Sequence, residues 1–154
     1  MIIIVDSREQ RPIVFKCETI RKGLKFGDYG AFFSKEYQCP VVFERKGIGD
    51  LFGTLTQGYD RFKKEIFRAK EANFKLIIAI EGTKERVLEG YKHSKRDPAS
   101  IIKQLETIRN RYEVEHLFFA SRIAMAQHIQ SFYETEYRNF MIPIEILSEV
   151  DPNG

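Results

Sequence analysis

The chain has 154 residues, of which 43% are hydrophobic and 31% are charged, and its formal net charge is +3. This length suits one domain with a real apolar core, and no apolar run approaches the roughly 20 residues that span a bilayer. Residues 1–5 are apolar, but they are too few for a secretion signal and no basic residues precede them. We therefore expect a cytoplasmic protein without a membrane partner, associated with the nucleoid in a prokaryote or virus and nuclear in a eukaryote.

Charge is distributed unevenly along the chain. Residues 1–112 carry 23 Lys and Arg against 15 Asp and Glu, a balance of +8, whereas residues 113–154 carry 2 against 7, a balance of −5. A basic body suits a phosphate-binding face, although ordinary solvated helices would give the same distribution. Cys17 and Cys39 have no C-x-x-C spacing, so we expect two reduced thiols rather than a zinc site.

The first third of the chain is typical of short strands followed by a helix. Apolar stretches predict strands in this order: residues 2–5, a weaker one within 13–26, and one at 41–46, with an aromatic-rich segment at 31–33 between the last two. Gly47 and Gly49 end the last of these strands. Asp50 then suits the N-cap of a helix that begins near Leu51.

Helices and strands alternate in the rest of the chain. The expected order is a helix at 59–72, a buried strand at 76–80, a short helix at 84–90, a basic loop at 91–96, a helix from Asp97-Pro98, a strand at 114–120 and a helix capped by Ser121. Residues 141–154 contain Pro143 and Pro152, and we expect a C-terminal tail there, after a domain of residues 1–140. This alternation predicts an α/β fold with a central mixed β-sheet flanked by α-helices.

The residues that suggest chemistry are Asp28 and, after 15 intervening residues, Glu44-Arg45-Lys46. Side chains alternate along a strand, so Glu44 and Lys46 share one face and Arg45 lies on the other. Phosphodiester hydrolysis needs carboxylates that hold a divalent metal and a cation that neutralises charge on the phosphate. Asp28 and Glu44 can hold Mg²⁺ or Mn²⁺, Lys46 can contact the attacking water and the phosphate, and Asp6, at the end of another strand, can add a third carboxylate. The alternative is that Glu44 and Lys46 form a solvent-facing ion pair on an edge strand.

Further residues tighten this interpretation. Four segments occur in a fixed order: Val5-Asp6-Ser7-Arg8-Glu9, Gly27-Asp28-Tyr29, Glu44-Arg45-Lys46 and Asp50-Leu51. Together they resemble the XPF-type structure-specific endonuclease family, whose pattern is G-D-x(n)-E-R-K-x(3)-D preceded by D-x-R-E. Gly53-Thr54-Leu55 and Arg61-Phe62 are also similar to the family's first helix, so the resemblance covers residues 2–120. It implies a restriction-endonuclease-like core that cuts branched or flap DNA with Mg²⁺ or Mn²⁺, in repair or recombination.

The resemblance also implies roles for individual residues. Those that match catalytic or supporting positions are Asp28, Glu44, Lys46, Asp6, Arg45 and Asp50, and those that match metal ligands are Asp28, Glu44, Asp6 and, more weakly, Glu9. Candidate DNA contacts are Arg8, Arg61, Lys64, Lys92 and Lys95. Alternatives stay open: a loop ion pair explains Arg8 and Glu9 equally well, Asp50 suits a plain helix cap, and Arg45 suits a brace for a carboxylate. A solvated surface is the alternative for the lysines.

Partners and activity follow as expectations. Family members commonly append a tandem helix-hairpin-helix domain, and residues 121–154 show no such paired signature. Family members work as dimers, so we expect a homodimer or a separate DNA-binding protein as partner. The helix from Ile123 to Tyr133 has apolar residues beyond one face, including Met125 and Tyr133; some of these would lie at the interface, and the alternative is that core packing explains most of them. Three hypotheses remain: an active endonuclease, a non-catalytic DNA-binding or partner-binding module on the same fold, and a restriction-type nuclease. The presence of both acids and the lysine favours an enzyme.

Overall fold

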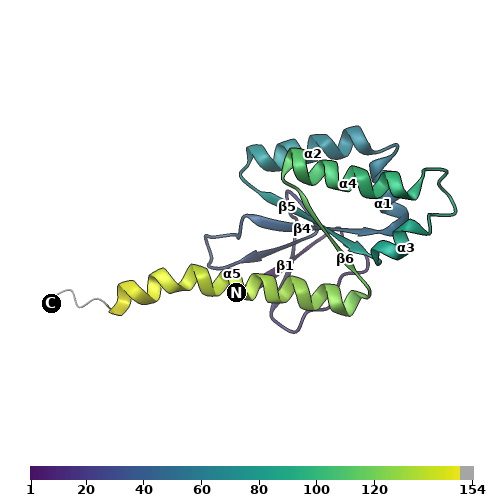
Figure 1. Cartoon of the computed structure of the whole chain (residues 1–154). Helices are drawn as coiled ribbons and strands as arrows, with labels where there is room; N and C mark the ends of the chain where they lie inside the picture. Colours follow the sequence, from purple (N-terminus) through teal and green to yellow (C-terminus); the bar gives the residue numbers. More distant parts are fainter. Residues whose placement is uncertain (150–154) are drawn as a thin grey trace.

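The computed structural model describes residues 1–149, and the side chains of residues 1–143. A six-stranded mixed sheet forms its centre, with the strand order β2-β1-β3-β4-β5-β6 (Figure 1). The strands are β1 Ile2–Asp6, β2 Thr19–Lys22, β3 Tyr29–Phe32, β4 Val41–Gly47, β5 Lys75–Glu81 and β6 Glu115–Phe119. The helices are α1 Ile48–Leu55, α2 Tyr59–Glu71, α3 Lys84–Leu88, α4 Pro98–Tyr112 and α5 Arg122–Glu149. The α/β architecture that the sequence predicts is confirmed.

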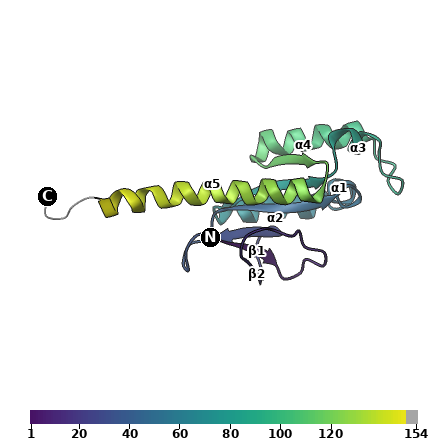
Figure 2. The same cartoon turned by 90° about the horizontal axis from the view of Figure 1, so that it is seen from below.

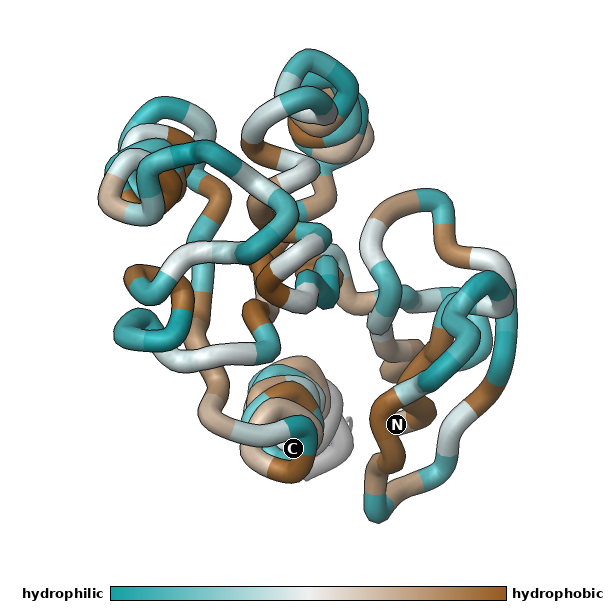
Figure 3. Tube along the Cα trace, turned by 90° about the vertical axis from the view of Figure 1, so that its right-hand side faces the viewer, coloured by the Kyte–Doolittle hydropathy of each residue, from teal (hydrophilic) through white to brown (hydrophobic). Residues whose placement is uncertain are grey.

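Two layers of helices enclose the sheet, with α1 to α4 on one face and α5 on the other (Figures 1 and 2). The alternation of β4 and β5 explains this division. Val42 and Ile78 pack with α1, α2 and α4, whereas Phe43 and Ile77 pack with α5. Hydrophobic positions are concentrated in the strand at the N-terminus and alternate with hydrophilic ones in the helices, while hydrophilic positions predominate in the outer loops (Figure 3). No described helix combines the length and the apolar character needed to cross a membrane.

Strand β4 lies inside the sheet, antiparallel to β3 and parallel to β5. Glu44 stands beside Ile78 of β5 and Lys46 beside Ile80. The alternative of an ion pair on an edge strand is therefore wrong, because β4 has a hydrogen-bonded neighbour on each side. Glu44 and Lys46 are thus charged residues on an interior strand, where burial of charge is unfavourable. The site described below explains why they lie there.

Helix α1 begins earlier than the sequence suggests. Strand β4 passes directly into it at Ile48, and Gly47, in an extended conformation, is the N-cap without a side-chain hydrogen bond. The prediction that Asp50 caps this helix is wrong, because Asp50 lies inside the first turn. A carboxylate there still interacts favourably with the positive end of the helix.

Helix α5 extends through the region expected to be a tail. Ser121 Oγ accepts the Ala124 N–H at the start, as the sequence predicts, and the helix then continues to Glu149 through Pro143. Tertiary packing reaches close to the proline, since the Phe140 ring stacks on that of Tyr37 with centroids 4.7 Å apart. Residues 141–149 of the expected C-terminal tail thus continue helix α5, residues 150–154 lie outside the described part, and the domain boundary after residue 140 stays a prediction.

The expected interface residues of α5 are core residues. Met125 and Tyr133 are both 0% exposed, and the Tyr133 hydroxyl donates to the carbonyl of Val41 over 2.7 Å. For these two residues the alternative of core packing is confirmed, because their side chains pack against the sheet of their own chain. The homodimer itself stays a prediction, and light scattering at micromolar concentration would test it.

Candidate active site

Asp28 is held against β4 by its own backbone and side chain. Its N–H donates to the Phe43 carbonyl over 2.7 Å, and its Oδ2 accepts the Arg45 N–H, also over 2.7 Å. The preceding Gly27 has a φ of +74°, and a Cβ there would lie 3.0 Å from the Phe43 carbonyl oxygen. Glycine is therefore required for this turn, which places the Asp28 carboxylate beside that of Glu44.

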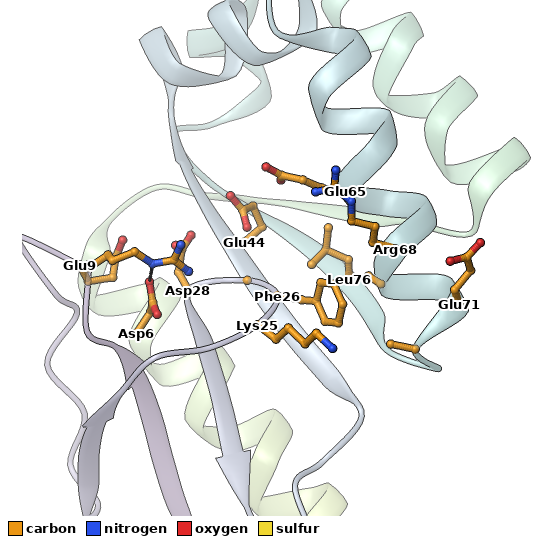
Figure 4. Close-up of a pocket in the computed structure, with 14 residues that line it drawn as sticks. Asp6, Glu9, Lys25, Phe26, Asp28, Glu44, Glu65, Arg68, Glu71 and Leu76 are labelled. Atoms are coloured by element: carbon orange, nitrogen blue, oxygen red, sulfur yellow. Dashed lines mark hydrogen bonds and ion pairs between the residues drawn. The ribbon is translucent and has the colours of Figure 1, made fainter.

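The two carboxylates line one cavity of about 870 Å³ between the sheet and α2. Glu44 lies between Asp28 on one side and Glu65, from α2, on the other (Figure 4). Lys46 follows on the same face of β4, with its Nζ 3.5 Å from Glu44 Oε1. A neighbouring cavity of about 420 Å³ shares Glu44 and Glu65 and adds Lys46.

Burial dominates the electrostatics of these acids. It raises the pKa of Asp28 to about 6, and the charge of Glu9 adds to the rise while the Arg45 N–H opposes it. Burial also raises the pKa of Glu44 to about 7, helped by the negative charges of Asp28 and Glu65 and opposed by Lys46. Lys46 alone therefore does not balance the negative charges of Asp28, Glu44 and Glu65. A further cation would stabilise the ionised carboxylates.

Glu65 has no place in the sequence predictions, although it faces the site. It projects from α2 next to the buried positions Phe62 and Ile66, at the border of the apolar face. The available signal was its spacing of four residues from Arg61, which puts both side chains on one side of the helix. The sequence shows the periodicity of α2, but it does not show which strand this helix packs against.

Asp6 and Arg8 form an ion pair at the edge of the same cavity. Asp6 is 2% exposed, its Oδ1 accepts the Leu24 N–H over 2.8 Å, and its Oδ2 accepts Arg8 Nε over 2.9 Å. Burial alone would raise the pKa of Asp6, but these hydrogen bonds hold it below its ordinary value. Asp6 lies beside Asp28 through the backbone, since its N–H donates to the Asp28 carbonyl over 2.9 Å. Protein donors thus already engage both of its carboxylate oxygens.

Glu9 and Arg45 contact each other away from Glu44. Glu9 Oε2 accepts the Tyr29 hydroxyl over 2.9 Å and Arg45 Nε over 3.0 Å. The Arg45 side chain points to the α5 side of the sheet, as strand alternation predicts, and it reaches Glu81 as well. In this arrangement Arg45 braces a carboxylate, and Glu9 is partnered by protein groups at one oxygen.

The other predicted residues lie at the periphery. Asp50 and Arg61 line the second cavity together with Lys46, whereas Lys64 is exposed on α2. Lys92 and Lys95 are exposed in the loop between α3 and α4. Arg96 anchors that loop, because its Nη1 donates to the Leu55 carbonyl and its Nε to Ser100 Oγ, each over 2.8 Å.

The donor set of the cavity fits a hard divalent cation. Mg²⁺ is commonly held by one or two carboxylates, with water and substrate phosphate completing its coordination. Asp28 and Glu44 supply such a pair, with charge that the protein does not balance. Among the described residues, no three His, Cys, Asp or Glu side chains lie close enough to hold an ion between them. Metal binding by Asp6 and Glu9 therefore stays a prediction.

Comparisons with known proteins bear on the family and the fold. Residues 5–132 match the family model of the ERCC4 domain. Among solved structures, the chain is similar to XPF from Aeropyrum pernix, with a TM-score of 0.70 and 21% identity over 94% of this chain and 69% of that one. It is also similar to XPF from Aeropyrum pernix in complex with DNA, with a TM-score of 0.68 and 22% identity over 90% and 66% of the two chains. No curated protein matches the chain by sequence. The structural likeness confirms the expected restriction-endonuclease-like fold.

Proposed function

The chain belongs to the ERCC4 domain family, and we propose that it is a metal-dependent endonuclease that hydrolyses phosphodiester bonds in DNA. The observation that carries the proposal is the placement of Asp28 and Glu44 in one cavity with Lys46 beside them. A Mg²⁺ or Mn²⁺ ion there would supply Lewis-acid activation of the phosphate and offset the charge that develops during hydrolysis. Asp28, directly before β3, and Glu44, on β4, would hold the ion in this cavity.

Lys46 has a different role from the carboxylates. Its ammonium group lies on the same face of β4 as Glu44 and is 18% exposed, so it is available at the cavity but held in place. A fixed cation that donates to the phosphate oxygens stabilises the transition state more than the ground state, because negative charge grows on those oxygens. We assign Lys46 to this contact and to the orientation of the attacking water.

Branched or flap DNA is the proposed substrate. XPF from Aeropyrum pernix has been solved in complex with DNA, and this chain carries basic residues around the cavity that suit a phosphate backbone. Arg8 and Lys25 line the first cavity and Arg61 lines the second. Contacts to phosphates alone give little sequence preference, so this arrangement favours a structure-dependent nuclease over a restriction-type nuclease that reads sequence.

A cleavage assay tests the proposal. Flap, fork and plain duplex substrates are incubated with the protein in Mn²⁺, in Mg²⁺ and in a chelator, and the same series is run with Asp28→Asn. We expect metal-dependent cuts by the unsubstituted protein and their loss in Asp28→Asn. Glu36→Gln is the matched control, because Glu36 is exposed in the turn between β3 and β4 at the other end of these strands.

Three outcomes separate the hypotheses. Cutting of flap or fork in preference to duplex supports the proposed substrate class. Cutting at one sequence in plain duplex would instead indicate a restriction-type nuclease. Binding of DNA without cutting in either metal would contradict the proposal and leave the non-catalytic module.

A further inference from the structure

On the face of β4 opposite Glu44, Arg45 begins a chain of alternating charges. Arg45 Nε lies 3.0 Å from Glu9 Oε2, and its Nη1 lies 2.8 Å from Glu81 Oε1. Arg122 Nη1 approaches the same Glu81 oxygen to 2.6 Å. The side chains of Glu9, Arg45 and Glu81 are at most 21% exposed, so water screens these contacts less than it screens a surface ion pair.

The chain of charges joins four parts of the fold. Glu81 is the last residue of β5, and Arg122 is the first residue of α5. Arg122 Nη2 donates to the Arg11 carbonyl, in the segment that follows β1. Glu81 lines a separate cavity, with Gly47, at the far end of the parallel strands. Glu81 and Arg122 are thus placed to act on the site through Arg45.

Arg45 is the link to the metal-binding pair. Its backbone N–H donates to Asp28 Oδ2, so the position of this residue determines where the Asp28 carboxylate lies. Its guanidinium neutralises Glu9, which lines the same cavity as Asp28. Glu9, Arg45, Glu81 and Arg122 together carry no net charge. The negative charge of Asp28 and Glu44 is therefore left for a cation, and loss of Glu81 alone would leave two arginines opposite one carboxylate.

We propose that Glu81 and Arg122 are positioning residues that hold Arg45 against Glu9 and thereby keep the Asp28 carboxylate, which accepts the Arg45 N–H, placed for a divalent cation. This inference rests on the proposed endonuclease function. Neither residue touches the reacting groups. Residues that support metal ligands from behind typically contribute about 10–100-fold in metal affinity or activity.

The test compares metal binding and folding in four variants: Glu81→Gln, Arg122→Gln, Arg122→Lys and Arg138→Gln. Mn²⁺ affinity is measured by calorimetry without DNA, the melting temperature is measured without metal, and cleavage is followed as a function of Mn²⁺ concentration. Glu81→Gln keeps the shape of the side chain and removes its charge, and Arg122→Gln removes the second cation. Arg138→Gln is the matched control, because Arg138 is an exposed arginine of the same helix whose guanidinium donates to Thr135.

We expect Glu81→Gln to weaken Mn²⁺ binding by about tenfold or more and to raise the Mn²⁺ concentration for half-maximal cleavage by a similar factor. A purely structural role would lower the melting temperature and leave the Mn²⁺ affinity of the folded protein unchanged. Arg122→Gln should weaken binding less, and Arg122→Lys, which keeps the charge beside Glu81, should recover part of that loss. Arg138→Gln should match the unsubstituted protein.

The outcomes distinguish this inference from the function on which it rests. If the unsubstituted protein binds Mn²⁺ and cuts DNA while Glu81→Gln and Arg122→Gln bind Mn²⁺ as Arg138→Gln does, the inference is overturned and the function stands. Arg122 is exposed, so its substitution leaves the core intact and keeps the test valid even where Glu81→Gln fails to fold. Failure of the unsubstituted protein to bind Mn²⁺ would overturn both.

Discussion

The pKa values of the two carboxylates predict a steep dependence of metal binding on pH. With pKa values of about 6 for Asp28 and about 7 for Glu44, both groups are ionised in about 5% of molecules at pH 6 and in about 90% at pH 8. Only the doubly ionised form presents the full donor set to a cation, so apparent Mn²⁺ affinity should rise about twentyfold over this range. The direction follows from burial, which disfavours the charged forms and makes protons compete with the metal at neutral pH.

Substitution of Glu44 provides the internal comparison. In Glu44→Gln only Asp28 titrates, and its ionised fraction changes about twofold between pH 6 and pH 8. The assay is a calorimetric titration of DNA-free protein with Mn²⁺ at pH 6, 7 and 8, for the unsubstituted protein and for this variant. An affinity of the unsubstituted protein that is constant over the range would refute the reasoning, because it would mean that burial has not raised these pKa values.

Three further predictions concern catalysis and stability. Lys46→Ala should lower kcat about 10²–10³-fold while DNA affinity changes little, because the contact of Lys46 with the phosphate strengthens in the transition state. Single-turnover kinetics and binding isotherms check this, and an equal loss in kcat and in DNA affinity would make Lys46 a simple phosphate anchor. Glu44→Gln should raise the free energy of unfolding at pH 8 by about 1–2 kcal/mol. A carboxyl whose pKa is higher in the folded than in the unfolded protein destabilises the fold increasingly as the pH rises from the unfolded pKa to the folded pKa, and the substitution removes that penalty. Urea unfolding at pH 5 and pH 8 measures the effect, and an effect that does not grow with pH would contradict the prediction. Gly53→Ala should stabilise the protein by about 0.5–1 kcal/mol, since Gly53 lies within α1 and a Cβ there would meet no atom within 4 Å. A lower denaturation midpoint for the variant would contradict this and show that the fold requires glycine at position 53.

The sequence predicts the strands and helices well where periodicity is strong. Strand β5, with five consecutive buried residues, and helix α2, with buried Phe62, Ile66 and Ala69, lie where the apolar patterns place them. Strand β2 is the weak case, because all four of its residues are exposed and it pairs in the described sheet with β1 at the edge. A strand held by backbone pairing at an edge leaves little hydrophobic pattern to detect.

Errors arose where tertiary contacts override local signals. Asp50 has the chemistry of an N-cap, but β4 runs straight into α1 and places the cap at Gly47. Pro143 usually ends a helix, yet α5 continues through it after the aromatic packing of Phe140. Met125 is a fully buried core residue that packs with the α5 side of the sheet. Near Pro143 the packing of Phe140 on Tyr37 joins segments far apart in the sequence, whereas the start of α1 is set by the strand directly before it.

The candidate site was predictable in its centre and not in its surroundings. The spacing of Asp28, Glu44 and Lys46 within strand patterns placed these residues together, and in the structure Asp28 and Glu44 line one cavity while Glu44 and Lys46 line the adjoining one. Glu65 and Glu81 gave no such signal, because each is an ordinary acid in its own element. Their relation to the site depends on how α2 and β5 pack around β4, which the sequence pattern alone does not specify.

The most direct test of the central claim is the rate at which Glu44→Gln cleaves a flap substrate in saturating Mn²⁺, measured with its DNA affinity and beside the Glu36→Gln control. If Asp28 and Glu44 form the metal-dependent site, Glu44→Gln abolishes cleavage and binds DNA at least as tightly as the unsubstituted protein, because a negative charge next to the phosphate has been removed. Cleavage by Glu44→Gln at the rate of the Glu36→Gln control would contradict the account, since the cavity would then not be where DNA is cut.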